Sequence, residues 1–174
     1  MKTNTTRDKI LELLFKFPLK KFHIRELSRV LKISPPAISN ALKQLEKEGF
    51  VLHISEEKTS YKIQANFSNK NFRNMKRIDN LKNIYSSGLL DYLIENFPLS
   101  AIILFGSYSK GDDTEKSDID MAIESKEKNL NLESYEKKLN KKINIEFISF
   151  SKLSNELRNS IINGIVLSGY VELK

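Results

Sequence analysis

The sequence predicts a mixed α/β protein of the α+β type, built from two modules that are joined by a helix. Apolar residues recur with the helical period through most of residues 1–87. Short apolar runs typical of strands are concentrated after residue 100. The charge divides in the same way: residues 1–85 hold 18 Lys and Arg against 8 Asp and Glu, whereas residues 86–174 hold 11 against 14.

The composition is that of a soluble globular protein. Of the 174 residues, 40% are hydrophobic and 29% charged, and the longest apolar run is far shorter than the roughly 20 residues of a membrane span. The N-terminus lacks a signal-peptide pattern. Because there is no cysteine and there are only two histidines, disulfides, thiolate chemistry and a zinc site are not expected. We expect a cytoplasmic protein.

Three helices are expected at the N-terminus. Thr5 or Thr6 can cap the first helix, which Pro18 ends, and its apolar positions are Ile10, Leu13, Leu14 and Phe17. A second helix covers residues 23–32. Ser34 is a good N-cap for the third helix, with Pro35 at its first position and Gly49 at its end. The second and third helices are joined by a tight turn.

A hairpin is expected next, with strands at 51–54 and 61–64 around a polar tip. Three helices followed by a hairpin resemble the winged helix-turn-helix DNA-binding domains, and the stretch SPPAISNALKQLEKEGFV resembles their recognition helix and first wing strand. The resemblance implies binding of double-stranded DNA in the major groove. The residues predicted to face DNA are Pro36, Ser39, Asn40, Lys43, Lys47 and, in the wing, Lys58. The alternative is a winged helix that contacts a protein.

Residues 66–87 are predicted to form an amphipathic, basic linker helix. Its apolar positions are Phe72, Met75, Ile78, Leu81 and Tyr85. This stripe can pack on one module or serve as a dimer seam, and because helix-turn-helix proteins commonly act as two-fold dimers we expect a homodimer. A basic half joined to an acidic half indicates one module that binds a polyanion and a separate module that carries the functional site. The alternative is that the lysine-rich composition serves only to keep the surface soluble.

The stretch from Phe105 to Ile123 carries the strongest functional signal. An apolar run leads into Gly106-Ser107, and after ten further residues comes Asp118-Ile119-Asp120. Side chains at positions i and i+2 of a strand lie on one face, so the two carboxylates are expected side by side. Such a pair suits a hard cation, since Mg²⁺ is usually held by one or two carboxylates plus substrate phosphates. The pattern therefore predicts metal-assisted chemistry at a phosphate.

A second phosphate-binding motif can be excluded. Gly106 and Gly111 have the spacing of the P-loop glycines, but Asp112 and Asp113 stand where that motif needs Lys followed by Ser or Thr.

The Gly-Ser and Asp-x-Asp spacing resembles the signature of the minimal nucleotidyltransferases of the DNA polymerase beta superfamily. The resemblance implies that Gly106 and Ser107 bind the nucleoside triphosphate, predicted to be ATP, and that Asp118 and Asp120 hold two Mg²⁺ ions. It also implies a third carboxylate on a neighbouring strand. Residues 143–148 alternate like a strand and offer Glu146, where the family more often has Asp. Lys110 is a candidate charge partner for the phosphates.

The predicted domains are a winged helix at 1–66, a linker helix at 67–87 and a minimal nucleotidyltransferase at 88–174, with a mixed sheet and flanking helices. One hypothesis is a DNA-binding enzyme that transfers a nucleoside monophosphate, AMP from ATP, to an acceptor such as a partner protein. The other is a non-catalytic, antitoxin-like regulator that uses the transferase fold to sense a nucleotide or bind a partner.

Overall fold

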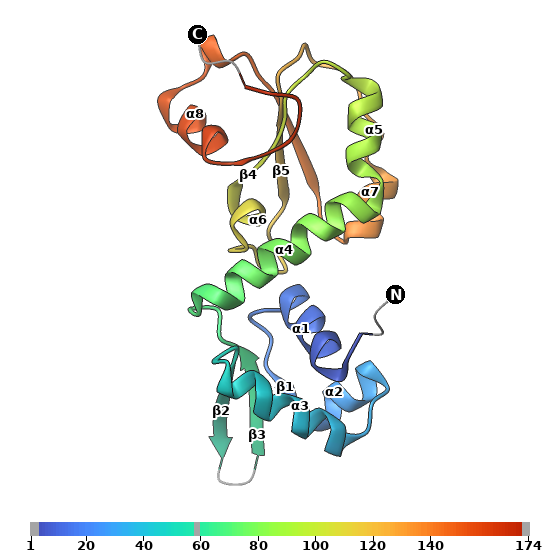
Figure 1. Cartoon of the computed structure of the whole chain (residues 1–174), viewed down its shortest axis with the longest axis vertical. Coiled ribbons are helices and arrows are strands. Elements are labelled where there is room, and N and C mark those ends of the chain that lie inside the picture. The colour runs from blue at the N-terminus through green and yellow to red at the C-terminus, as the bar shows by residue number, and fades with distance from the viewer. Residues whose placement is uncertain (1–3, 58–59, 172–174) are drawn as a thin grey trace. The chain divides into compact units, whose positions relative to one another are not determined.

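The computed structural model describes residues 4–57 and 60–171 (Figure 1). By contact density the chain divides into two compact units, Met1–Lys76 and Arg77–Lys174. The division falls within helix α4 (Lys70–Ser87), so the predicted linker is a helix whose residues belong to both units.

The N-terminal unit has the predicted order of helices followed by a hairpin. It contains α1 (Thr6–Lys16), β1 (Phe22–His23), α2 (Ile24–Leu31), α3 (Pro35–Lys47), β2 (Val51–Glu57) and β3 (Ser60–Ala65). The antiparallel sheet has the order β1-β3-β2. The sequence analysis did not predict β1, because an element this short shows no periodicity.

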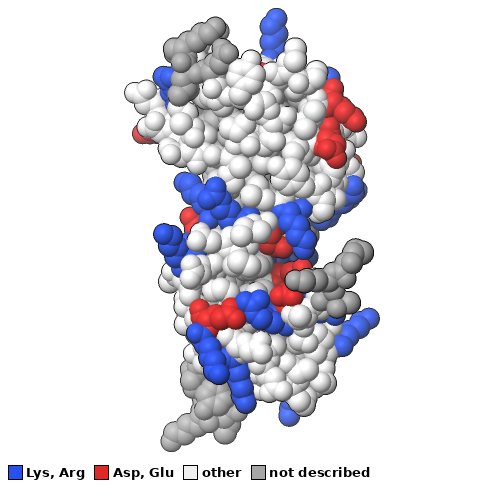
Figure 2. Space-filling model, viewed as in Figure 1, with Lys and Arg blue, Asp and Glu red and all other residues white. Residues whose placement is uncertain are grey.

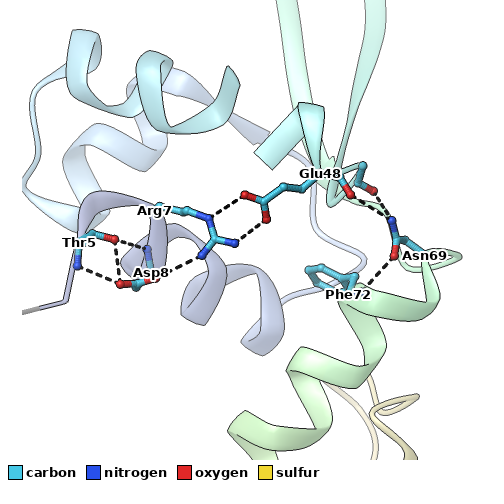
Figure 3. A network of polar contacts seen from close by, with 7 residues as sticks. Thr5, Arg7, Asp8, Glu48, Asn69 and Phe72 are labelled. Atoms are coloured by element: carbon cyan, nitrogen blue, oxygen red, sulfur yellow. Dashed lines mark hydrogen bonds and ion pairs between the residues drawn. The ribbon is translucent and has the colours of Figure 1, made fainter. Parts of the chain in front are cut away.

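The first helix begins as its sequence predicts. The Thr5 side chain accepts a hydrogen bond from the backbone N–H of Asp8, and the Asp8 carboxylate accepts one from the backbone N–H of Thr5, which together form a capping box (Figure 3). The Thr5 hydroxyl also donates to the Asp8 carboxylate at 2.8 Å. This bond is the largest cause that lowers the pKa of Asp8, and the bond from the Thr5 backbone N–H is the next. Arg7 ties this helix to the end of α3, since its Nε lies 3.1 Å from Oε1 of Glu48.

Asn69 connects the end of α3 to helix α4. Its Nδ2 donates to the carbonyl of Gly49 at 3.0 Å, and its Oδ1 accepts from the backbone N–H of Phe72 at 3.1 Å (Figure 3). The helix starts at Lys70, after the predicted start at residues 66–67, because the Asn69 side chain accepts from the backbone N–H groups of Asn71 and Phe72 in the first turn. The buried Phe72 ring packs on Phe15 and Phe50, with centroids 5.1 and 6.1 Å away.

The C-terminal unit is a mixed sheet with flanking helices, as predicted (Figure 1). Its elements are α5 (Leu89–Asn96), β4 (Ile102–Phe105), α6 (Gly106–Lys110), β5 (Ile119–Ile123), α7 (Glu133–Leu139), β6 (Ile143–Phe147), a 3-10 turn (Phe150–Lys152), α8 (Asn155–Ile162) and β7 (Ile165–Ser168). The strand order is β6-β5-β4-β7. Strand β4 is antiparallel to β5 and β7, and β5 is parallel to β6.

Each face of this sheet has its own apolar layer. Ile102, Leu104, Ile119 and Met121 pack with helix α5, whereas Ile103, Phe105 and Ala122 pack with residues of α8 such as Ile161. Figure 1 shows α5 and α8 on opposite sides of the strands. Because the strand side chains alternate between these layers, residues 118 and 120 belong to the face that α8 partly covers.

Gly106 and Ser107 open a short helix, α6, directly after β4. The sheet is completed by β7. No helix in residues 4–57 and 60–171 has the length and apolarity that crossing a membrane requires.

Candidate functional site

The end of strand β4 brings Gly106 against Asp120. Phe105, the last residue of β4, pairs with Asp120 in the antiparallel ladder. Gly106 follows with a φ of +72°, and a Cβ placed on it would lie 2.5 Å from Oδ2 of Asp120. Only glycine satisfies both conditions without displacing the carboxylate, so this residue sets how closely the backbone approaches Asp120.

The side-chain amide of Asn144 contacts the carboxylates of both Asp118 and Asp120. Asn144 lies opposite Asp120 in the parallel ladder of β5 and β6. Its Nδ2 is 3.3 Å from Oδ2 of Asp118 and 3.1 Å from Oδ1 of Asp120. Asp118 and Asn144 are exposed and Asp120 is half-buried, so the carboxylate pair is accessible to solvent.

From the sequence, Glu146 was the residue predicted on this strand, and Asn144 was given no role. Asn144 could have been identified only from the register of β5 against β6, because that register decides which residue of β6 lies opposite Asp120. A single sequence does not give that register.

Glu146 lies on the same face one step further along the strand. It pairs with Ala122 rather than with Asp120, and it is exposed. Within the part of the chain that the structure describes, no three or more His, Cys, Asp or Glu side chains are grouped so as to hold a metal ion. Asp118 and Asp120 are therefore brought together without Glu146, whose role stays a prediction.

Helix α6 carries the other predicted residues. Ser107 is half-buried, and its carbonyl accepts a hydrogen bond from the backbone N–H of Asp112 at 3.0 Å. Lys110 is exposed at the end of this helix, and Gly111 closes it with a φ of +74°. Ser109 is buried and donates to the carbonyl of Gly106 at 2.8 Å, which holds the first turn of the helix together.

The loop before Asp118 is held by a buried carboxylate that the sequence analysis noted only as a departure from the P-loop. Asp113 is 1% exposed. It accepts a hydrogen bond from Asn80 Nδ2 at 2.7 Å, and its Oδ2 lies 3.4 Å from Lys141 Nζ. Lys141 Nζ also donates to the carbonyls of Thr114 and Ser117, at 2.6 and 3.0 Å. These contacts fix the chain that leads into the site.

Tyr108 is buried behind this loop. Burial raises the pKa of its phenol well above the usual value, and the nearby charges of Asp113 and Asp79 raise it further, whereas a hydrogen bond with Asn83 acts in the opposite sense. The phenol is consequently neutral over the whole physiological range and belongs to the packing of α6.

The donor set of this site fits a hard divalent cation. Two carboxylates offer oxygen ligands, and rotation of the Asn144 amide by a half turn presents its carbonyl oxygen in place of Nδ2. Mg²⁺ usually completes such a set with water and substrate phosphates. The open position of Asp118 leaves space for both.

The predicted DNA-facing residues of α3 lie on its accessible side. Pro36, Asn40, Lys43 and Lys47 are exposed and Ser39 is partly exposed, while the core is formed by Ile38, Ala41, Leu42 and Leu45. Lys58, predicted in the wing, lies outside the described residues. Figure 2 shows Lys and Arg side chains interspersed with Asp and Glu on the face drawn. The basic excess of the N-terminal half does not form one uninterrupted patch on that face.

Comparison with known families identifies both units. Residues 88–170 match the family model described as polymerase beta, nucleotidyltransferase. Residues 4–52 match the model described as bacterial regulatory protein, arsR family. Neither the comparison with curated proteins nor the comparison with solved structures found a match. The fold and the two matches together define a nucleotidyltransferase domain joined to a helix-turn-helix domain. In this chain an N-terminal helix-turn-helix domain precedes a C-terminal nucleotidyltransferase domain.

Proposed function

We propose that the protein is a DNA-binding nucleotidyltransferase that transfers AMP from ATP to a hydroxyl group of a partner protein. The observation that carries the proposal is the convergence of Asp118 and Asp120 beside Gly106, at the edge where β4 ends and β5 begins. The same edge carries the Gly-Ser pair. A carboxylate pair next to a close backbone approach suits the positioning and charge neutralisation on which phosphoryl chemistry depends.

Asp118 and Asp120 would hold two Mg²⁺ ions, which when bound neutralise the charge of the triphosphate and of the leaving pyrophosphate. Gly106 lets the backbone approach the β- and γ-phosphates, and the Ser107 hydroxyl donates to them. Lys110, exposed at the end of α6, would supply a positive charge for the phosphates. This division of roles requires no cysteine or histidine.

In the transfer step the acceptor hydroxyl oxygen forms a bond to the α-phosphorus of ATP. The bond from that phosphorus to the bridging oxygen of the β-phosphate breaks, and pyrophosphate leaves. Glu146, on the same face of the sheet as Asp120, accepts the hydroxyl proton. Its exposed position suits a group that must meet a partner protein.

The N-terminal domain would place this reaction on DNA. Asn40 and Ser39 of α3 can reach base edges, while Pro36 contacts the groove wall, and Lys43 and Lys47 can bind phosphates. We further propose that the protein acts as a homodimer, because α4 exposes Met75, Ile78 and Tyr85 along one side.

The test is magnesium-dependent transfer from labelled ATP, with the other three nucleoside triphosphates as comparison. We expect label on the partner protein, or pyrophosphate release, that is lost when Asp118→Asn and Asp120→Asn are combined. The matched control is Glu124→Gln, which removes one carboxylate from the residue that follows β5. Activity unchanged in the double variant would falsify the proposal.

A second function is favoured by one observation, the neutral Asn144 between the two carboxylates. With fewer negative groups at the cation site, the domain could bind a nucleotide and signal to the DNA-binding domain without turnover. Tight ATP binding that alters operator affinity, with no pyrophosphate released, would support this regulatory function over transfer.

A further inference from the structure

We propose that Asn144 is the third member of the cation-binding face, and that because this member is neutral the cation is captured together with the nucleotide rather than in advance of it. The inference rests on the proposed function, since it concerns the same carboxylates. It adds a residue to the site and an order of binding.

The register of the parallel strands selects Asn144. It is the residue directly opposite Asp120, whereas Glu146 is opposite Ala122. Partners in a ladder have neighbouring side chains on one face, while a side chain two residues further is a diagonal neighbour. Asn144 also reaches Asp118, at 3.3 Å, so one side chain contacts both carboxylates.

The charge of this position sets how strongly the site attracts a free cation. Asp118 and Asp120 supply two negative charges, and Asn144 supplies an oxygen ligand without a third. The number of charged ligands tunes the affinity of carboxylate sites for divalent cations over several orders of magnitude. The phosphates of a bound nucleotide would then supply the negative charge that β6 does not.

The amide also explains how the site stays ordered before a cation arrives. Two carboxylates side by side repel each other, and the Asn144 Nδ2 donates to an oxygen of each, at 3.3 and 3.1 Å. A half turn of the amide exchanges Nδ2 for Oδ1, so the donor of the cation-free state becomes a ligand of the loaded state. An aspartate here could offer the ligand but not the donor.

The experiment measures Mn²⁺ binding to the full chain by calorimetry, first alone and then with a non-hydrolysable ATP analogue. We expect weak binding of Mn²⁺ alone and at least about tenfold tighter binding with the analogue. Asn144→Asp should tighten the binding of Mn²⁺ alone by about tenfold and so reduce the dependence on nucleotide. Asn144→Ala should weaken binding under both conditions. Glu124→Gln, at the residue that follows β5, is the control for the loss of a carboxylate outside the site. Thermal melting of each variant shows that it is folded.

The variants distinguish a failure of the role of Asn144 from a failure of the cation site itself. If Asn144→Asp and Asn144→Ala both bind Mn²⁺ as the natural protein does, or if Glu146→Gln loses binding that Asn144→Ala retains, Asn144 is not the third member and the inference fails. If the combined Asp118→Asn and Asp120→Asn variant also keeps its Mn²⁺ binding, the site itself fails, and with it the proposed function.

Discussion

The carboxylate of Asp120 lies so close to the backbone of Gly106 that a Cβ on the glycine would stand 2.5 Å from Oδ2. The Gly-Ser pair and the Asp-x-Asp pair, which are ten residues apart in the sequence, are therefore in contact in the fold. Because Asp120 is also the residue that Asn144 contacts, the position of Gly106 affects the whole carboxylate pair.

Gly106→Ala should damage the site more than the fold. Both Gly106 and Gly88 have positive φ, +72° and +81°, but a Cβ on Gly88 would meet no atom within 4 Å. Each alanine should therefore cost about 1 kcal/mol of unfolding free energy through backbone strain. Only Gly106→Ala should also weaken Mn²⁺ and ATP binding, measured by calorimetry. Equal binding by the two variants would contradict the role of the contact.

The buried pair of Asp113 and Lys141 should stabilise the loop that carries Asp118. Its side chains are 2% and 13% exposed, whereas those of the Glu133 and Lys137 pair are 71% and 74% exposed. We expect Asp113→Asn to lower the unfolding free energy by about 3 kcal/mol, since a partner of a buried charge is lost. Lys137→Met should change it by less than about 1 kcal/mol. Denaturant titration measures both, and similar losses would show that the buried pair is not special.

Tyr108 should make the protein sensitive to alkali. Burial raises the pKa of its phenol above the ordinary value of 10.0, so the neutral form is favoured in the fold. Its contribution to stability is full below pH 10.0 and is lost as the pH rises through the higher folded pKa. Tyr108→Phe should flatten the fall in unfolding free energy with pH in this alkaline range, measured by denaturant titration. Tyr85→Phe, at an exposed tyrosine, is the control, and a slope that is unchanged in Tyr108→Phe would be the contrary result.

Lys43 and Lys47 should contribute to DNA binding through phosphates. Each lysine that neutralises a phosphate adds about 0.9 to the slope of log affinity against log salt. Lys43→Ala and Lys47→Ala should each lower that slope by about this amount in a fluorescence titration with duplex DNA. Lys9→Ala, which removes an exposed lysine from α1, should leave it unchanged. If none of the variants changed the slope, α3 would not be the DNA-contacting helix.

The sequence was sufficient for the order of most elements and for the class of both domains. Caps such as Thr5 and Ser34 mark helix starts, a continuous apolar run marks β4, and alternation marks β6. The Gly-Ser and Asp-x-Asp spacing predicted a nucleotidyltransferase domain, which the family match confirms.

The sequence could not predict strand register or contacts between segments that are distant in the chain. The register of β5 against β6 places Asn144 opposite Asp120, and it depends on packing that periodicity does not encode. The partners of Asp113 are Asn80 and Lys141, which are distant in sequence. The burial of Asp113 could therefore not be predicted from the sequence either. The short β1 and the start of α4 at Lys70 likewise follow from contacts made by neighbouring segments.

Asp118 and Asp120 are proposed to form a site for a cation and a nucleotide. The most direct measurement is a crystal structure of the full chain with Mn²⁺ and a non-hydrolysable ATP analogue, in which anomalous scattering locates the cation. We predict an anomalous peak bound by both carboxylates, with the triphosphate against Gly106 and Ser107. A peak and nucleotide elsewhere on the protein, with Asn144 still donating to both carboxylates, would contradict the account.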